Sequence, residues 1–307
     1  MPELPEVEVV RAGLQPAVTD ALVTGVEIFD ERSLRRHVPA AGSFAEQLSG
    51  RRILAAVRRG KFLWLPLDSS RALVIHLGMS GQVLLRTPGA ALDRMVRIRL
   101  TLEHPTHGEL WVNFVDQRIF GSMAVDEMGP TGDGFSGGYS GSLEADAAWR
   151  HRIPSQVAHI ARDPIDPSFS SSAFFAALAR KNTGIKRALL DQNLISGIGN
   201  IYADEALFAA RIHYEQPAAS LSPAKARTLL AAVRTILQRA LAEGGTSFDA
   251  QSGQVNGQSG YFAHSLEAYG RQGTPCSRCG TPIVREQFMN RGSHFCPHCQ
   301  RLRLPAA

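Results

Sequence analysis

The sequence predicts an α+β protein in which a sheet-forming half precedes a helical half. Short runs rich in β-branched residues, separated by turn residues, occupy positions 52–67, 72–86, 95–102 and 109–125. Such runs are typical of a β-sandwich or a β-barrel. Farther along the chain apolar residues recur at helical spacing, and the four cysteines all lie from position 276 to position 299. A small cysteine-rich module is therefore expected after the helices.

The helical half contains one long and three short helical patterns. The long pattern begins at Ser222-Pro223, where serine can cap the helix and proline suits its first turn, and it ends at Gly244-Gly245. The short patterns lie at 173–181, 185–192 and 201–210. Between the two halves, residues 129–142 are rich in Gly and Ser, which predicts a flexible loop or linker.

Length and composition predict a globular protein of about two domains. The 307 residues are 44% hydrophobic and 20% charged, and no apolar run approaches the roughly 18 residues that a membrane-spanning helix needs. The amino terminus is acidic and lacks the positively charged leader of a secreted protein, and the clustered cysteines do not resemble a distributed disulfide framework. We therefore expect a cytoplasmic protein.

Positive charge is concentrated in three runs of a chain whose net charge is +5. The runs lie at 51–61, 180–187 and 271–303. Any one of them, taken alone, is best interpreted as solvated surface. Together they favour a polyanionic partner such as nucleic acid.

The amino terminus itself suggests covalent chemistry. Once the initiator methionine is removed, Pro2 is a secondary amine that lies beside the carboxylate of Glu3. An α-amino group titrates near 8 and a lysine near 10.4, so more of the terminal amine is neutral and nucleophilic at pH 7. The pair could form an imine, with Glu3 moving protons. The alternative is that Pro5 and Glu6 merely begin a helix.

The cysteines have the spacing of a zinc finger. Cys276-Ser-Arg-Cys279 is followed, after sixteen residues, by Cys296-Pro-His-Cys299. Two such knuckles close a tetrahedral four-thiolate site, which leaves no position for water, so one structural zinc ion is expected. A redox Cys-x-x-Cys pair is the weaker alternative.

Specific motifs occur along almost the whole chain. They are Met1-Pro-Glu-Leu-Pro-Glu-Val-Glu8, Arg58-Arg-Gly-Lys-Phe62, His76-Leu-Gly-Met-Ser-Gly81, Asp116-Gln-Arg-Ile-Phe-Gly121, Leu189-Leu-Asp-Gln192, Gly197-Ile-Gly-Asn-Ile-Tyr-Ala-Asp-Glu205, Gly260-Tyr-Phe262, Tyr269-Gly-Arg271 and the four cysteines. In this combination the chain resembles the formamidopyrimidine-DNA glycosylases, bacterial base-excision enzymes that remove 8-oxoguanine and ring-opened purines.

The resemblance implies a fold and a division into domains. It implies an N-terminal β-sandwich domain with flanking helices, then a helical helix-two-turns-helix domain with a four-cysteine zinc finger. The expected divisions are a catalytic domain at 1–128, a Gly/Ser-rich loop and linker at 129–153, the helix-two-turns-helix DNA-binding domain at 154–246, a lesion-recognition loop region at 247–264 and the zinc finger at 265–303.

The resemblance also implies the catalytic residues. Pro2 would attack deoxyribose C1′, expel the damaged base and form an imine, and Glu3 would be the general acid/base. Lys61 would contact phosphate beside the lesion, Glu6 matches a second carboxylate near the reaction centre, and Arg291 matches the arginine that reaches the flanking phosphates. β,δ-Elimination would then cut the strand, with no cofactor beyond the one structural zinc.

Three residues match the family's wedge, which fills the gap left when a nucleotide is flipped out of the duplex. They are Met79, Arg118 and Phe120; two are apolar and enter the base stack, while the arginine can hydrogen-bond the orphaned cytosine. Without the resemblance, Met79 and Phe120 would be interpreted as core residues. Gln117 and Ile119 depart from the family pattern.

Further phosphate contacts are expected from the helical half. Asn200 lies in a Gly-Ile-Gly-Asn turn where the family grips phosphates, and Lys186 is expected to add to the same surface. A plain interhelical turn is the alternative for Asn200. Residues 251–254 of the expected recognition loop are more polar than the family pattern. This departure bears on which lesions the protein prefers.

The expected partner is damaged double-stranded DNA, with no membrane contact and no obligate protein partner. The protein is expected to be a monomer associated with the nucleoid. One alternative is an endonuclease VIII-like glycosylase for oxidised pyrimidines, against which Leu4 and Gly260-Tyr-Phe262 count. The other is a catalytically silent zinc-finger DNA-binding protein, against which Pro2, Glu3 and Lys61 count.

Overall fold

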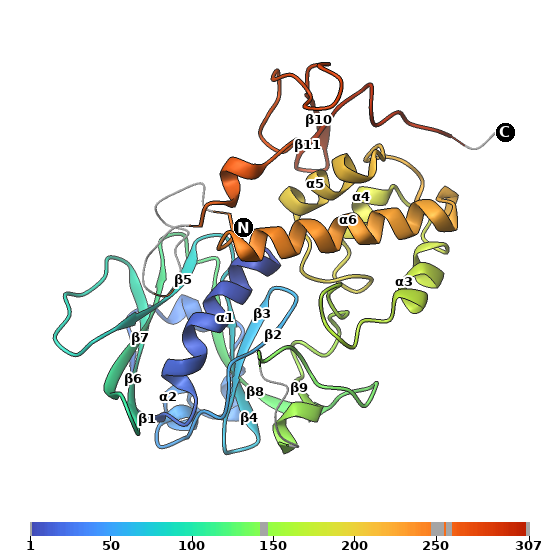
Figure 1. Cartoon of the computed structure of the whole chain (residues 1–307). Coiled ribbons are helices and arrows are strands. Elements are labelled where there is room, and N and C mark those ends of the chain that lie inside the picture. Colours follow the sequence, from blue (N-terminus) through green and yellow to red (C-terminus); the bar gives the residue numbers. More distant parts are fainter. Residues whose placement is uncertain (1, 142–146, 247–254, 256–259, 305–307) are drawn as a thin grey trace. The chain divides into compact units, whose positions relative to one another are not determined.

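The chain forms two compact units in the computed structural model (Figure 1), which describes residues 2–141, 147–246, 255 and 260–304. The first unit comprises Met1–His159 together with Gly244–Gly260. The second comprises Ile160–Glu243 together with Tyr261–Ala307. The predicted divisions follow one another along the chain, whereas here the segment Gly244–Gly260 belongs to the first unit.

Two antiparallel sheets build the first unit. One has four strands in the order β1-β6-β7-β5, and the other has five in the order β2-β3-β4-β8-β9. The strands of the first sheet are β1 (Leu22–Ile28), β5 (Gly81–Arg86), β6 (Val96–His104) and β7 (Gly108–Asp116). Those of the second are β2 (Val57–Arg59), β3 (Phe62–Pro66), β4 (Arg71–His76), β8 (Ser122–Pro130) and β9 (Arg152–Pro154).

One apolar core joins the two sheets and two helices. It includes Leu100 and Phe114 from the four-stranded sheet, Leu63 and Ile75 from the five-stranded sheet, and Leu14 from α1. The helices of this unit are α1 (Leu4–Val18), α2 (Phe44–Leu48) and the short 3-10 turns η1 (Glu31–Leu34), η2 (Pro39–Ala41) and η3 (Ala148–His151). Because the core lies between two separate sheets, the first unit is a sandwich and not a barrel.

Three of the four predicted β-runs are two strands joined by a tight turn. The run at 52–67 contains β2 and β3, the run at 72–86 contains β4 and β5, and the run at 109–125 contains β7 and the start of β8. The strand register pairs Phe62 with His76 and His76 with Ser122. The turns at 60–61, 77–80 and 117–121 therefore meet at one end of the five-stranded sheet.

The stretch at 129–153 differs from the predicted loop and linker. Its first residues complete β8, and its last residues form β9, in which Ile153 pairs with Gly129. In addition, the backbone of Tyr139 exchanges two hydrogen bonds with Arg58, of 2.9 and 2.8 Å. The described part of this stretch thus folds onto the sheet, which the Gly and Ser content concealed because backbone pairing needs no side chain.

The second unit is helical and carries a two-stranded hairpin. Its helices are α3 (Ser171–Leu178), α4 (Ile185–Leu190), α5 (Asn200–Ala210) and α6 (Pro223–Ala242), with the turns η4 (Ala218–Ser220) and η5 (Phe262–Ser265) and the strands β10 (Val284–Phe288) and β11 (Arg291–Phe295). The Ser222 hydroxyl accepts a hydrogen bond from the Lys225 N–H at 3.3 Å, so the predicted cap of α6 is confirmed. Helices α5 and α6 lie side by side in Figure 1.

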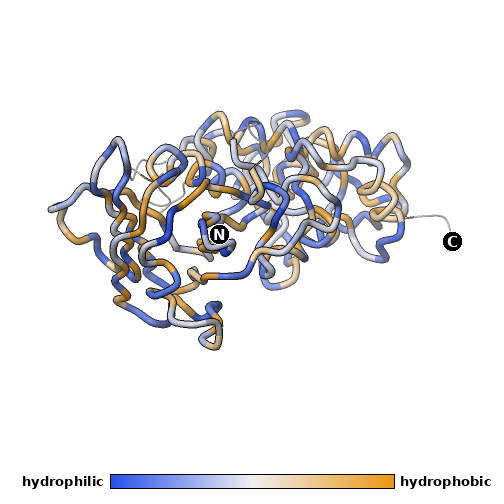
Figure 2. The backbone as a smooth tube through the Cα atoms, turned by 90° about the horizontal axis from the view of Figure 1, so that it is seen from below, coloured by the Kyte–Doolittle hydropathy of each residue, from blue (hydrophilic) through white to orange (hydrophobic). Residues whose placement is uncertain are grey.

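Hydrophobic and hydrophilic stretches alternate along the described chain, as Figure 2 shows. Among the described residues, none of the helices is both long and apolar enough to cross a membrane.

Candidate functional site

The amino-terminal residues are held at the start of α1. Glu3 is the N-cap and is only 3% exposed, and Pro2 before it is half-buried. The Glu6 carboxylate accepts hydrogen bonds from the N–H groups of Glu3 at 2.7 Å and of Thr246 at 2.8 Å. The interpretation of Pro5 and Glu6 as the start of a helix is therefore confirmed. The Glu6 carboxylate stabilises this start by binding the backbone of Glu3 and that of Thr246. This role of Glu6 is compatible with a reactive amine at Pro2, because the hydrogen bond to Glu3 fixes the residue next to Pro2.

A buried ion pair connects α1 to the turn that carries Lys61. The Arg58 guanidinium donates to Glu8 at 2.8 Å and to the Gly60 carbonyl at 3.2 Å, and Arg11 also pairs with Glu8. Arg58 is 1% exposed. The interpretation of the basic run 51–61 as solvated surface is thus wrong for Arg58, because the carboxylate of Glu8 compensates its charge inside the protein.

His76 lies at the same end of the sheet, and no role was predicted for it. Its ring packs on Phe62 with a centroid distance of 4.9 Å, and its Nδ1 accepts the Gly78 N–H at 3.2 Å. Burial, together with the charges of Arg36 and Lys61, lowers the pKa of His76 to about 4. The imidazole is therefore neutral at pH 7, and its proton is on Nε2. The motif at 76–81, given above, contains His76 and could have pointed to this residue.

The three expected wedge residues lie on two neighbouring turns. Met79 is in the turn between β4 and β5, and Arg118 and Phe120 are in the turn between β7 and β8. Phe120 is 40% exposed, and the Arg118 guanidinium lies 4.6 Å from the centre of its ring. The core interpretation is therefore wrong for Phe120, which remains at the surface although it is a large apolar side chain.

Asp116 holds the second of these turns from inside the protein. Its carboxylate, fully buried, accepts hydrogen bonds from the Arg118 N–H at 3.1 Å and from the Gly121 N–H at 2.6 Å. The turn between β4 and β5 packs directly against the turn between β7 and β8, because a Cβ atom at Gly78 would lie 2.3 Å from the Phe120 carbonyl. Gly78 also has a φ of +64°, so two independent constraints require glycine there.

In the second unit, Asn200 and Arg291 line one cavity of about 350 Å³. Asn200, at the start of α5, donates through its amide to the Gly292 carbonyl at 3.1 Å. Arg291, at the start of β11, is exposed. The other residues that line the cavity are Tyr269, Gly270, Arg285, Gly292 and His294. Two arginines and no carboxylate make the cavity suitable for an anion.

Lys186 is not on the surface where it was expected. Its side chain is wholly buried, its ammonium pairs with Asp204 at 2.7 Å, and it donates to the Ser293 hydroxyl at 2.7 Å and the Gly292 carbonyl at 3.1 Å. The prediction of an exposed cation is therefore wrong, because a buried carboxylate and β11 surround this lysine completely. Its position indicates that it holds the hairpin next to Arg291.

A second buried carboxylate holds the beginning of the finger. Glu205 accepts hydrogen bonds from the N–H groups of Glu267, Ala268 and Tyr269 at 2.8–3.0 Å. Burial raises the pKa of Glu205, although these three donors act in the opposite direction. Both acidic residues, Asp204 and Glu205, belong to a quoted motif, but their role in holding the finger was not predicted.

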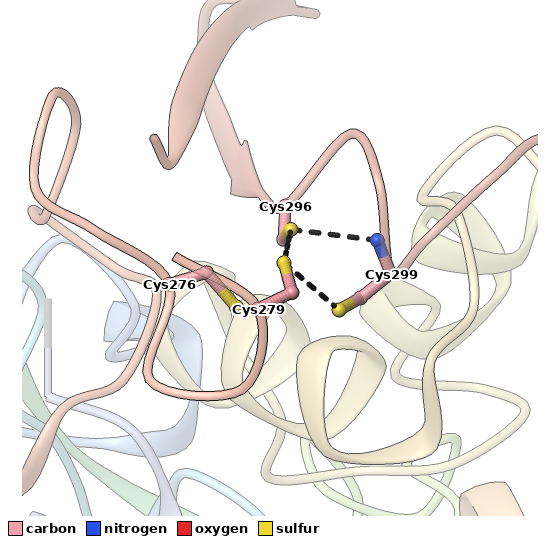
Figure 3. Close-up of side chains that lie close together, drawn as sticks. All are labelled: Cys276, Cys279, Cys296 and Cys299. Atoms are coloured by element: carbon pink, nitrogen blue, oxygen red, sulfur yellow. Dashed lines mark hydrogen bonds between the residues drawn. The ribbon is translucent and has the colours of Figure 1, made fainter. Parts of the chain in front are cut away.

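The four cysteines form a metal site. Figure 3 shows Cys276 and Cys279 on one loop, opposite Cys296 and Cys299 on another, and the four sulfur atoms lie within 4.8 Å of one another. The sulfur of Cys279 is 3.5 Å from that of Cys296 and 3.6 Å from that of Cys299. Tetrahedral zinc with bonds of about 2.3 Å needs sulfur atoms about 3.8 Å apart, so the donors fit one structural Zn²⁺.

The expected lesion-recognition loop lies mostly outside the described residues. The structure does not describe positions 247–254 and 256–259, which include the polar residues 251–254. Within this loop Val255 is described: it packs in the core of the first unit, and its carbonyl accepts the Leu85 N–H at 3.0 Å.

Models of three domains match the chain. The formamidopyrimidine-DNA glycosylase N-terminal domain matches residues 1–123, the formamidopyrimidine-DNA glycosylase H2TH domain matches 160–252, and the zinc finger found in FPG and IleRS matches 273–302. Together they confirm the predicted sandwich, helical domain and four-cysteine finger.

Curated relatives and solved structures agree with these matches. A formamidopyrimidine-DNA glycosylase of Leifsonia xyli is 66% identical over 98% of this chain and 100% of its own length, and one of Thermobifida fusca is 53% identical over 98% and 97%.

The crystal structure of the MutM (Fpg) protein from Thermus thermophilus is 34% identical, with a TM-score of 0.77, and covers 99% of this chain and 100% of that one. A complex of Lactococcus lactis Fpg with DNA containing an abasic site is 28% identical, with a TM-score of 0.77 and coverage of 97% and 99%. The chain therefore belongs to the formamidopyrimidine-DNA glycosylase family.

Proposed function

We propose that this protein is a bifunctional DNA glycosylase and AP lyase of base excision repair. It removes 8-oxoguanine and formamidopyrimidines from duplex DNA through an imine at Pro2. The observation that carries the proposal is the Pro2-Glu3 pair at the start of α1, in a chain that matches this family over nearly its whole length. A related Lactococcus lactis protein has been crystallised with DNA that contains Fapy-dG, which is a lesion of the proposed class.

The chemistry begins with the neutral amine of Pro2. Its lone pair attacks C1′ of the damaged nucleotide, the bond from C1′ to the base breaks, and the base leaves with a proton. Glu3 moves protons between the amine, the sugar oxygen and the leaving group. Opening of the sugar ring gives an iminium ion, which acidifies the C2′ proton. Loss of that proton expels the 3′ phosphate, and a second elimination expels the 5′ phosphate.

Two groups at one end of the sandwich are suited to hold the damaged strand. Lys61 supplies a cation, and neutral His76 offers its Nε2–H to a phosphate oxygen. In this proposal Met79, Arg118 and Phe120 enter the duplex where the nucleotide has left, and Arg118 reads the opposite cytosine. The exposure of Phe120 supports this role, since a ring buried in the core could not enter a duplex.

Asn200 and Arg291 are proposed to bind the phosphates that flank the lesion. The anion cavity between them supports that role, and the start of α5 adds the partial positive charge of a helix amino terminus. Lys186 contributes through the position of β11, without reaching the DNA. Zinc supplies only the folded shape of the finger, which its four thiolates hold.

The same proposal extends to the setting of the protein. It is a monomer that acts on damaged double-stranded DNA without an obligate protein partner, in the cytoplasm with the nucleoid. It also requires that Met1 be removed, because an acylated Pro2 nitrogen is not nucleophilic.

Borohydride trapping tests the mechanism. An 8-oxoguanine:cytosine duplex is incubated with the processed protein and reduced, and the cross-linked residue is mapped by mass spectrometry. The expected adduct is on Pro2, and it is expected to fall strongly in Pro2→Ala and to persist in the control Pro5→Ala. An adduct on another residue, or none, contradicts the imine at Pro2.

Substrate comparison tests the lesion class. Excision from 8-oxoguanine:cytosine is expected to exceed excision from thymine glycol:adenine. The opposite order would indicate an endonuclease VIII-like enzyme, and DNA binding without any excision would indicate a silent zinc-finger protein.

A further inference from the structure

Arg35 binds three successive carbonyl groups of the turn that carries Phe120. It follows η1, and its Nη1 donates to the Ile119 carbonyl at 2.9 Å and to the Gly121 carbonyl at 2.7 Å. Its Nη2 donates to the Phe120 carbonyl. One guanidinium therefore holds the whole backbone segment at 119–121, although it lies more than eighty residues earlier in the sequence.

This segment needs to be held, because its conformation is not one that the chain adopts easily. Ile119 has a φ of +55°, in the left-handed region that β-branched residues avoid. The next residue, Phe120, keeps an apolar ring 40% exposed to water. Without external contacts the backbone would relax toward negative φ at Ile119 and would move both Phe120 and Arg118.

The two sides of the turn are held by different residues. On the inner side, the buried Asp116 carboxylate accepts the N–H groups of Arg118 and Gly121. On the outer side, Arg35 donates to the three carbonyls. The amides and the carbonyls around Phe120 thus have separate partners, and removal of Arg35 leaves the buried half of the arrangement in place.

Arg35 itself is exposed, and this distinguishes positioning from stability. Hydrogen bonds of an exposed side chain contribute little to the free energy of unfolding, since water replaces them. The loss of Arg35 should therefore change where the turn points without unfolding the sandwich.

We propose that Arg35 is a positioning residue for the wedge: it fixes the 119–121 backbone so that Phe120 enters the base stack and Arg118 meets the opposite cytosine. This inference rests on the proposed function, which assigns Arg118 and Phe120 to the wedge. It predicts that Arg35 contributes to selectivity for the opposite base without contacting DNA phosphates.

The test compares Arg35→Ala and Arg35→Lys with Arg32→Ala. Arg32 is a matched control, because it is exposed on η1 and its guanidinium binds Asp30 at 2.8 Å instead of the turn. Single-turnover excision is measured on 8-oxoguanine opposite cytosine and opposite adenine. Arg35→Ala is expected to lose about tenfold in excision opposite cytosine, with a much smaller loss opposite adenine. Arg35→Lys should be intermediate, and Arg32→Ala should match the wild type.

Two further measurements separate positioning from other roles. The salt dependence of binding to undamaged duplex should be the same for Arg35→Ala and wild type, whereas a phosphate ligand would lower its slope by about one. A lower slope with equal losses opposite both bases would overturn the proposal. So would a large drop in Tm together with a uniform loss of activity, or unchanged selectivity.

The arrangement of the turn can also be followed without activity. Amide hydrogen exchange at residues 117–121 of the free protein should be faster in Arg35→Ala than in Arg32→Ala and wild type. Equal exchange rates would overturn the proposal even if the enzyme is active. If the exchange differs but the wild type excises no lesion, the proposed function fails while the role of Arg35 in holding the turn stands.

Discussion

The two units present their candidate site residues in opposite ways. In the first unit Lys61, Met79 and Phe120 lie on turns at the end of a sheet, and the turn of Phe120 is held by the buried Asp116 on its inner side and by the exposed Arg35 on its outer side. In the second unit Arg291 lies on a hairpin that is held by Lys186 and Asp204, both almost completely buried. A turn held on one side from the surface can adjust when a ligand arrives, whereas a hairpin held by a buried ion pair maintains one geometry.

This difference suggests a division of tasks within the proposed mechanism. The wedge enters a duplex and must tolerate a changing partner, so part of its support is the exposed guanidinium of Arg35, whose hydrogen bonds water can replace. The anion cavity binds a phosphate of constant shape, so its supports are buried charges. The experiments below are expected to change one unit and leave the other intact, in decreasing order of effect.

Removal of zinc should have the largest effect, and only on the second unit. Binding of a structural zinc ion contributes about 10–16 kcal/mol to the folding of isolated fingers. Cys296→Ser, or a strong chelator, should therefore unfold the finger and abolish specific DNA binding. Zinc content and Tm are the measurements. Ser277→Ala, between two ligands, is the control, and retained binding in a zinc-free Cys296→Ser protein would contradict the prediction.

Glu3→Gln should stop the chemistry while leaving DNA binding nearly unchanged. The amide keeps the size of the side chain but cannot exchange protons, so excision should slow by about a thousandfold. Excision rate and DNA affinity are measured together. Glu31→Gln, on the exposed η1, is the control. A loss of affinity as large as the loss of rate would indicate that Glu3 is structural.

Lys186→Met should destabilise the hairpin next to Arg291. The substitution leaves Asp204 charged and without its buried partner, which typically costs about 3–5 kcal/mol. The free energy of unfolding should fall, zinc should be lost more easily, and the salt slope of DNA binding should stay the same. Arg187→Met removes the exposed neighbouring charge and should not change stability. A lower salt slope in Lys186→Met alone would instead indicate a direct phosphate contact.

Acidic pH should destabilise the first unit through His76. The pKa of His76 is about 4 in the folded protein and about 6.5 when unfolded. The contribution of neutral His76 to the free energy of unfolding is therefore complete above pH 6.5. It is lost as the pH falls toward 4, by up to about 3 kcal/mol, because the unfolded state binds the proton more tightly. Urea unfolding at pH 7.5 and 4.5 should show a smaller difference for His76→Gln. His159→Gln, at an exposed histidine, should behave like the wild type.

Much of the fold was predictable because its signals are local. The cap at Ser222, the glycines after α6 and the cysteine spacing all act within a few residues, and the structure confirms each. The strand pairs in the first half were predicted as single runs, because short turns such as 60–61 and 77–80 hardly interrupt the β-branched pattern. The missed turns are the ones that carry the candidate site residues.

The sequence by itself determined the fold class, the zinc ligands and the amino-terminal Pro2-Glu3 pair, since each depends on residue type and short spacing. Only the tertiary structure decided which charges are buried and what they hold. Lys186, Arg58 and Arg35 look alike in the sequence, yet the first pairs with Asp204, the second with Glu8, and the third binds the turn at 119–121. Their hydrogen-bond partners lie up to 107 residues away. The energy of a charge depends on its surroundings, and those surroundings exist only after the chain has folded.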